Sequence, residues 1–106
     1  MIHLYIDTTK EKVELQEAVR VSDITTTIAS IPAGTSWANY INKTDYEIDG
    51  YKLIGFVGQV GGNGVILCDW NIASSDQKLM LSFVNPMSTD RTNVTINVKG
   101  LYVKVA

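Results

Sequence analysis

A chain of 106 residues is long enough for one domain with a single hydrophobic core and too short for two. Apolar residues make up 45% of it and charged residues 19%, which excludes an intrinsically disordered protein. The net charge is −2, the basic residues are scattered, and no apolar run approaches the ~20 residues of a membrane span. We therefore expect neither nucleic-acid binding nor membrane insertion.

The first 23 residues form an N-terminal segment whose conformation the sequence leaves open. Thr8 and Glu11 have the spacing of a helical capping box, whereas the alternating apolar residues of Lys10–Val21 fit a strand. The alternation favours a strand, and a short helix is the alternative. We treat residues 1–23 as separate from the domain that follows, and as a candidate arm at a subunit interface.

Two strands are expected next, Ile24–Ile31 and Ser36–Ile41, joined by a turn that contains Pro32. A polar loop, Asn42–Gly50, follows them. Its acidic residues imitate the first half of a calcium loop, but Phe56 stands where an EF-hand requires a bidentate Glu. We therefore expect a solvated turn and no metal site.

The run Tyr51–Val60 has apolar side chains at positions of both parities, which is unusual for a strand of a small antiparallel sheet. Leu53 and Val57 share one parity, and Ile54, Phe56 and Val60 share the other. Burying both faces of a strand requires a packing layer on each side of its sheet, and a chain of this length has few residues for a second layer. We therefore predict a subunit interface formed by Leu53, Ile54, Phe56 and Val57; coverage by the chain's own N-terminal segment is the alternative.

Three further strands are expected at Val65–Ile72, Lys78–Val84 and Asn93–Ala106. The loop Gly61–Gly64 before the first of them ends in the Asn-Gly pair of a hairpin turn. Alternation within the first strand places Cys68 and Trp70 in the core. The apolar parity of the last strand changes at Gly100, which indicates a β-bulge at or near this residue.

Together these elements predict an all-β fold. Short strands separated by turns at regular intervals are typical of an antiparallel β-sandwich. We expect a jelly-roll-like sandwich of about seven to eight strands over residues 24–106.

The chain carries no recognisable catalytic constellation. Its only histidine is His3, and neither a G-x-S-x-G elbow nor an H-E-x-x-H motif occurs. The glycines between Gly55 and Gly64 lie within and between expected strands and lack the Lys-Ser/Thr of a phosphate loop, so they are typical of close packing and turns. We expect no enzymatic activity and no cofactor.

One set of side chains has the composition of a sugar-binding site. Sugars present apolar faces edged with hydroxyl groups, which aromatic rings and carboxylates can recognise. The polar loop and the strand before it supply such groups, and the predicted ligand-binding residues are Trp37, Tyr40, Asp45, Tyr46 and Asp49. An ordinary solvated loop would have the same composition, so that alternative stays open.

The order of motifs over residues 24–106 resembles a known family. A Pro-x-Gly turn precedes Trp37, Gly50-Tyr51-Lys52 opens a strand, and the chain closes with Leu101-Tyr102-Val103-Lys104. This arrangement resembles the C-terminal domains of tail-fibre and baseplate proteins, the receptor-binding proteins of phages and prophages of Gram-positive bacteria.

The resemblance implies a homotrimeric fibre tip, made in the host cytoplasm and located in the virion tail. Such a tip contacts other tail proteins and binds a receptor on the bacterial envelope, either a surface polysaccharide or a teichoic acid. Two alternatives stay open: a purely structural fibre module without a ligand, and a stand-alone carbohydrate-binding domain.

Overall fold

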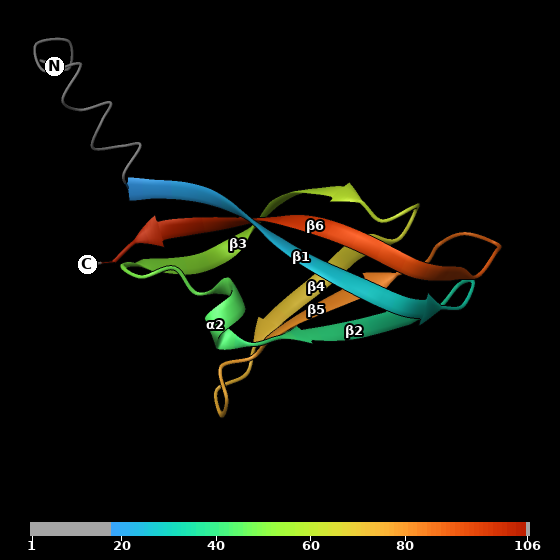
Figure 1. Cartoon of the computed structure of the whole chain (residues 1–106), viewed down its shortest axis with the longest axis horizontal. Coiled ribbons are helices and arrows are strands. Elements are labelled where there is room, and N and C mark those ends of the chain that lie inside the picture. Colours follow the sequence, from blue (N-terminus) through green and yellow to red (C-terminus); the bar gives the residue numbers. More distant parts are fainter. Residues whose placement is uncertain (1–17, 106) are drawn as a thin grey trace, which may run out of the picture.

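The fold consists of two three-stranded antiparallel sheets packed face to face (Figure 1). The structure is a computed structural model, and it describes residues 18–105. Sheet A has the strand order β1-β6-β3, formed by Val19–Ile31, Arg91–Lys104 and Tyr51–Gly61. Sheet B has the order β2-β5-β4, formed by Ser36–Ile41, Leu79–Val84 and Ile66–Ile72. A single helical turn, α2 (Lys43–Tyr46), lies between β2 and β3.

The expectation of an all-β antiparallel fold is confirmed, with six strands over the described residues rather than seven or eight. The first strand begins at Val19 and not at Ile24, so residues 19–23 belong to sheet A. The part of the expected Lys10–Val21 strand that precedes residue 18 lies outside the described residues.

The core lies between the two sheets and is formed by one face of each strand. The central strand β5 alternates strictly, with Leu79, Leu81 and Phe83 fully buried. The central strand β6 alternates in the same way from Val94 to Tyr102. Burying an aliphatic or aromatic side chain of this size contributes about 1.5–3 kcal/mol, so these two strands supply much of the stability.

Strand β6 itself does not carry the β-bulge predicted at or near Gly100. Strand β6 pairs with β1 in a constant register from Ser22↔Gly100 to Val19↔Val103. Gly100 faces the core, where an added Cβ would lie 3.0 Å from a side-chain carbon of Leu53. The apolar parity changes because the outward-facing residues of β6 become apolar at this end, not because the strand slips.

Two bulges occur instead in β3, where they change which side chains face outward. The pair Ile54 and Gly55 opposes Leu101, and the pair Val57 and Gly58 opposes Lys99. Each bulge inserts one residue, so Leu53 and Phe56 both face the core despite their opposite parity. The apolar residues of both parities therefore do not line two faces of a regular strand. Leu53 is buried in the core and Phe56 is partly buried against it, so neither lies on the outer surface where the interface was predicted.

A third bulge, in β4, overturns the prediction that Cys68 is buried. Residues Cys68 and Asp69 together oppose Ser82, and this insertion turns the thiol outward. Trp70, which was expected in the core, is partly buried and packs against it. Its ring contacts that of Phe56 edge to face, with the ring centroids 5.5 Å apart.

The loop Gly61–Gly64 does not form the predicted hairpin, because β3 and β4 lie in different sheets. It carries the chain across the sandwich through a run of positive φ angles, including 98° at Gly62. A Cβ at Gly62 would lie 2.7 Å from Val65 O, so only glycine fits there.

Two side-chain amides connect the sheets where backbone pairing stops. Gln59 of β3 donates to Val65 O (2.6 Å) and accepts from Leu67 N (2.9 Å) on the β4 side. On the opposite side, Asn39 of β2 donates to Thr27 O of β1 at 2.9 Å. These amides satisfy backbone groups at strand edges, which would otherwise lack a protein partner.

We predict that Gln59→Ala lowers the free energy of unfolding by about 1–3 kcal/mol, because it leaves two partly buried backbone groups without their partner. Urea unfolding followed by circular dichroism measures the change. Asn42→Ala is the matched control, since the Asn42 side chain caps no backbone group. Equal effects of the two substitutions would contradict a role for Gln59 in joining the sheets.

Candidate functional site

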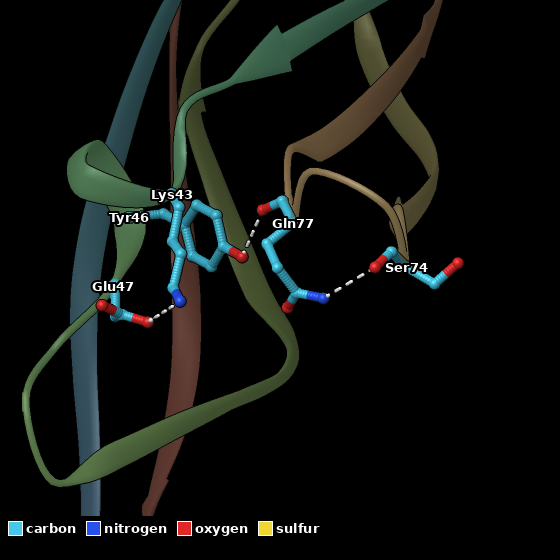
Figure 2. Close-up of polar contacts among 5 residues, drawn as sticks. All are labelled: Lys43, Tyr46, Glu47, Ser74 and Gln77. Atoms are coloured by element: carbon cyan, nitrogen blue, oxygen red, sulfur yellow. Dashed lines mark hydrogen bonds and ion pairs between the residues drawn. The ribbon is translucent and has the colours of Figure 1, made fainter.

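The five predicted ligand-binding residues do not form one site. Tyr46, at the end of α2, is buried with 8% of its surface exposed. Its hydroxyl donates to Gln77 O at 2.7 Å, as Figure 2 shows, and its own carbonyl accepts from the Tyr102 hydroxyl at 2.5 Å. Tyr46 is therefore a structural residue that joins α2 to the β4–β5 turn, and the prediction that it stacks on a sugar is wrong.

Asp45 and Asp49, the two predicted carboxylates, are exposed in the segment around α2. Within this segment an ion pair joins Lys43 to Glu47 at 3.5 Å (Figure 2). Both side chains of that pair are half exposed, so it contributes little to stability. With Tyr46 turned inward, the two carboxylates are left without the aromatic ring that was expected to accompany them.

A pocket of about 150 Å³ lies beside this segment, between α2, the start of β3 and the β4–β5 turn. Glu47 and Lys52 are its charged lining residues, and Tyr51, Tyr102 and Ile72 contribute apolar wall. Ligand sites for drug-sized molecules are usually several hundred Å³. The pocket therefore suits a packing defect better than a binding site for a sugar chain.

Trp37 and Tyr40 lie on opposite faces of β2. Trp37 pairs with the inward-facing Phe83 but sits at the sheet edge, 50% exposed, where its indole N–H donates to Asn39 Oδ1 at 2.7 Å. Tyr40 pairs with Met80 on the outer side and is 64% exposed. Only Tyr40 belongs to a broad exposed sheet surface.

That surface, here called the sheet B face, is the outer side of β2, β5 and β4. Because Leu79, Leu81 and Phe83 point inward, their neighbours in β5 point outward together with the residues paired to them. The members are Ser36, Ala38, Tyr40, Ile66, Asp69, Asn71, Met80, Ser82 and Val84. Asp69 and Asn71 were missed from the sequence, because their place beside Tyr40 depends on a register that includes the bulge at Cys68.

The outer side of sheet A carries a second surface, here called the apolar patch. Register places Val21 beside Leu101 and Val19 beside Val103, with the Ile54 and Val57 bulges along the neighbouring strand. The patch consists of Val19, Val21, Ile54, Val57, Leu101 and Val103, of which the first four are 46–56% exposed. Ile54 and Val57 are thus available for the interface predicted from the sequence. The other four were missed, although their alternation within each strand was a usable signal.

From the row of Val57 onward the outer side of sheet A becomes mostly polar, with Val60, 55% exposed and paired with Asn97, as an aliphatic exception. Lys99 Nζ pairs with Asp23 Oδ1 at 2.9 Å, and Thr27 and Thr95 approach each other at 3.2 Å between their hydroxyls. The exposed aliphatic side chains are therefore densest at one end of the sheet, where Val19, Val21, Leu101 and Val103 lie together.

Burial raises the pKa values of two tyrosines in the α2 region. For Tyr46 the main cause is desolvation and the second is the neighbouring Glu47 carboxylate. For Tyr102 desolvation again comes first, then Tyr46, with Arg20 acting in the opposite direction. Both hydroxyls donate to backbone carbonyls, a role that ionisation removes.

We predict that the protein loses stability as the pH rises above about 10, the ordinary pKa of tyrosine. A folded-state pKa above the unfolded one means that this contribution is complete below pH ~10 and is lost as the pH rises through the folded-state value. The variant Tyr46→Phe/Tyr102→Phe should be less stable at pH 7 but should decline less between pH 9 and 11. Urea unfolding across this range tests it, and parallel declines would contradict it.

Among residues 18–105 no group of three or more His, Cys, Asp or Glu side chains is placed to hold a metal ion. Within the same range no helix has the length and apolar character needed to cross a membrane. The two outer sheet surfaces are therefore the features left to explain. Comparisons of the chain with protein-family models, with curated proteins and with solved structures found no match.

Proposed function

We propose that this chain is a non-enzymatic tip domain of a phage or prophage tail fibre or baseplate, that it assembles as a homotrimer, and that it binds a glycan of the bacterial surface. The observation that carries the proposal is the apolar patch on sheet A. It is a surface with the composition of an interface, and no described element of the chain covers it.

The patch favours assembly for a simple energetic reason. Its aliphatic side chains lie side by side in register, so they form one continuous surface and not scattered exposed residues. Removing apolar surface from water contributes roughly 25 cal/mol per Å², and a neighbouring subunit supplies the cover. In a closed ring of three, each copy would place its patch against a different surface of the next copy.

Two of the motifs that carry the family resemblance, Gly50-Tyr51-Lys52 and Leu101-Tyr102-Val103-Lys104, are neighbours in space, which supports treating them as one unit. Tyr51 pairs with Lys104 and Lys52 pairs with Val103, so the start of β3 lies along the end of β6. The N–H of Val105 then donates to Gly50 O at 2.9 Å. Both motifs adjoin the apolar patch, because Val103 belongs to it and Lys52 is paired with Val103.

We predict that Val57→Asp converts a trimer into the 11.7 kDa monomer, because a carboxylate would be buried in the subunit interface without a partner. Size-exclusion chromatography with light scattering measures the mass. Ile66→Asp is the matched control, since Ile66 is a similarly exposed aliphatic residue on the outer side of sheet B. A wild-type protein that is monomeric at micromolar concentration would contradict the proposed assembly.

Binding to cells separates the receptor-binding tip from the alternatives. Fluorescently labelled wild-type protein should attach to Gram-positive cells and to their isolated walls after protease treatment. A trimer that binds no wall would leave a purely structural fibre module. A monomer that binds walls would instead favour a stand-alone carbohydrate-binding domain.

A further inference from the structure

We infer that Arg91, at the end of the sandwich remote from the apolar patch, is an anion-binding residue that takes a phosphate or carboxylate group of the surface polymer. The inference rests on the proposed function, and it adds to that function a site and a ligand chemistry. Three observations carry it: a buried guanidinium nitrogen without an acceptor, a neighbouring carboxylate that is bonded elsewhere, and a loop that is held in place beside the arginine.

The side chain of Arg91 points toward the core at the open end of the sandwich. Arg91 begins β6 and pairs with Ile31, which is fully buried. Residues paired directly across antiparallel strands point to the same face of the sheet, so the Arg91 side chain leaves β6 on the core side. Its Nε is buried and has no hydrogen-bond partner among residues 18–105. The guanidinium therefore carries a donor that these residues do not satisfy.

One edge of the guanidinium plane is held by a weak acceptor. Arg91 Nη2, which shares this edge with Nε, donates to Met87 Sδ at 3.0 Å, and a thioether sulfur accepts hydrogen bonds only weakly. Met87 is unbranched, flexible and 38% exposed, so it can move away from the edge. Its departure would leave two parallel N–H donors, the fork that matches two oxygens of a phosphate or carboxylate.

No carboxylate of the described part of the chain compensates the charge of Arg91. Its sequence neighbour Asp90 is directed elsewhere, because Oδ1 of Asp90 accepts from Ala33 N at 2.8 Å. Between residues 18 and 105 the ion pairs are Lys99–Asp23 and Lys43–Glu47, and neither involves Arg91. A cation that is partly withdrawn from water without a partner costs free energy, and an oxyanion ligand would remove this cost.

The loop beside Arg91 is held in place by a single buried amide. Asn85 is fully buried, and its Nδ2 donates to Ile31 O at 3.0 Å and to Thr89 O at 2.9 Å. Its Oδ1 accepts from Met87 N at 3.0 Å. The backbone around Arg91 is therefore ordered before a ligand arrives, which lowers the entropy cost of binding.

The position of Arg91 leaves it accessible in the proposed trimer. Strand β6 runs from the loop before Arg91, at one end of the sandwich, to the C-terminal end of the chain at the other (Figure 1). Leu101 of the apolar patch lies roughly 30 Å along the same strand. Contacts through the patch would therefore not cover Arg91.

The second arginine of the chain provides a matched control. The sequence contains two arginines, Arg20 and Arg91. Arg20 is exposed at the other end of sheet A, where its guanidinium lies 5.9 Å from the centroid of the Tyr51 ring. Arg20→Gln and Arg91→Gln thus remove the same charge from opposite ends of the molecule, and a general electrostatic attraction would respond equally to both.

Isothermal titration of the full chain with poly(glycerol phosphate), polygalacturonate and dextran tests the inference. We expect at least one of the two polyanions to bind and dextran not to bind, and the tighter polyanion identifies phosphate or carboxylate as the preferred group. Arg91→Gln should weaken binding at least about tenfold, whereas Arg20→Gln should leave it within about twofold. Equal losses in the two variants would overturn a site at Arg91.

Thermal unfolding distinguishes ligand binding from a structural role of Arg91. Arg91→Met keeps an apolar side chain in place and removes the unpaired charge, so its melting temperature should equal or exceed that of the wild type. A lower melting temperature would assign Arg91 a structural role and overturn the inference.

Nuclear magnetic resonance of the ¹⁵N-labelled wild type gives a readout that needs no stable variant. The Nε–H signal of Arg91 should shift in a saturable manner when glycerol 1-phosphate or galacturonate is added, and the Arg20 signal should stay in place. Absence of a shift at Arg91 would contradict the site.

The outcomes separate this inference from the proposed function. If walls bind wild-type protein and Arg91→Gln equally, the Arg91 site is overturned while the receptor-binding function stands. Binding of dextran in place of both polyanions overturns the ligand chemistry. Failure of the wild type to bind any wall overturns both.

Discussion

The structure depends on where three β-bulges are placed. Two lie in β3 and one in β4, the strands on either side of the Gly61–Gly64 crossing. Each adds one residue and so reverses the relation between sequence parity and side-chain direction beyond it. The reversal turns Phe56 and Trp70 toward each other within the core, and it puts Val57 and Cys68 on the outside. Both surfaces discussed above owe their composition to these insertions.

This dependence explains which parts of the fold could be predicted from the sequence. Strands without insertions were predictable: β2 has the bounds expected for it, and β5 differs from its expected range by one residue at its start. For β3 and β4 the alternation alone misplaces side chains, because a bulge leaves little local trace. Gly55 and Gly58 accompany the two bulges of β3, yet glycine also occurs in strands for other reasons. Local sequence patterns also could not predict which strands share a sheet. The Asn63-Gly64 pair is typical of a hairpin, but here it lies in a loop that connects strands of two different sheets.

The same limits apply to the candidate site. Composition placed Tyr40 and Tyr46 together in the predicted ligand-binding set, and it could not separate them. Tyr40 is exposed on the short edge strand β2, whereas the burial of Tyr46 depends on a carbonyl of Gln77 that is distant in sequence. Asp69 and Asn71 gain their position only through pairing with β5, so no local pattern connects them with Tyr40.

The apolar patch and Arg91 lie toward opposite ends of β6, and this arrangement has a consequence for binding strength. Subunits that meet through the patch would each direct Arg91 away from the shared contact. A repetitive polymer could then engage several copies at once, and each further contact would be intramolecular. Weak individual sites would suffice for firm attachment to a cell wall, while free monosaccharides would compete poorly. Avidity, not the depth of any pocket, would then determine how the domain distinguishes a surface from a solute.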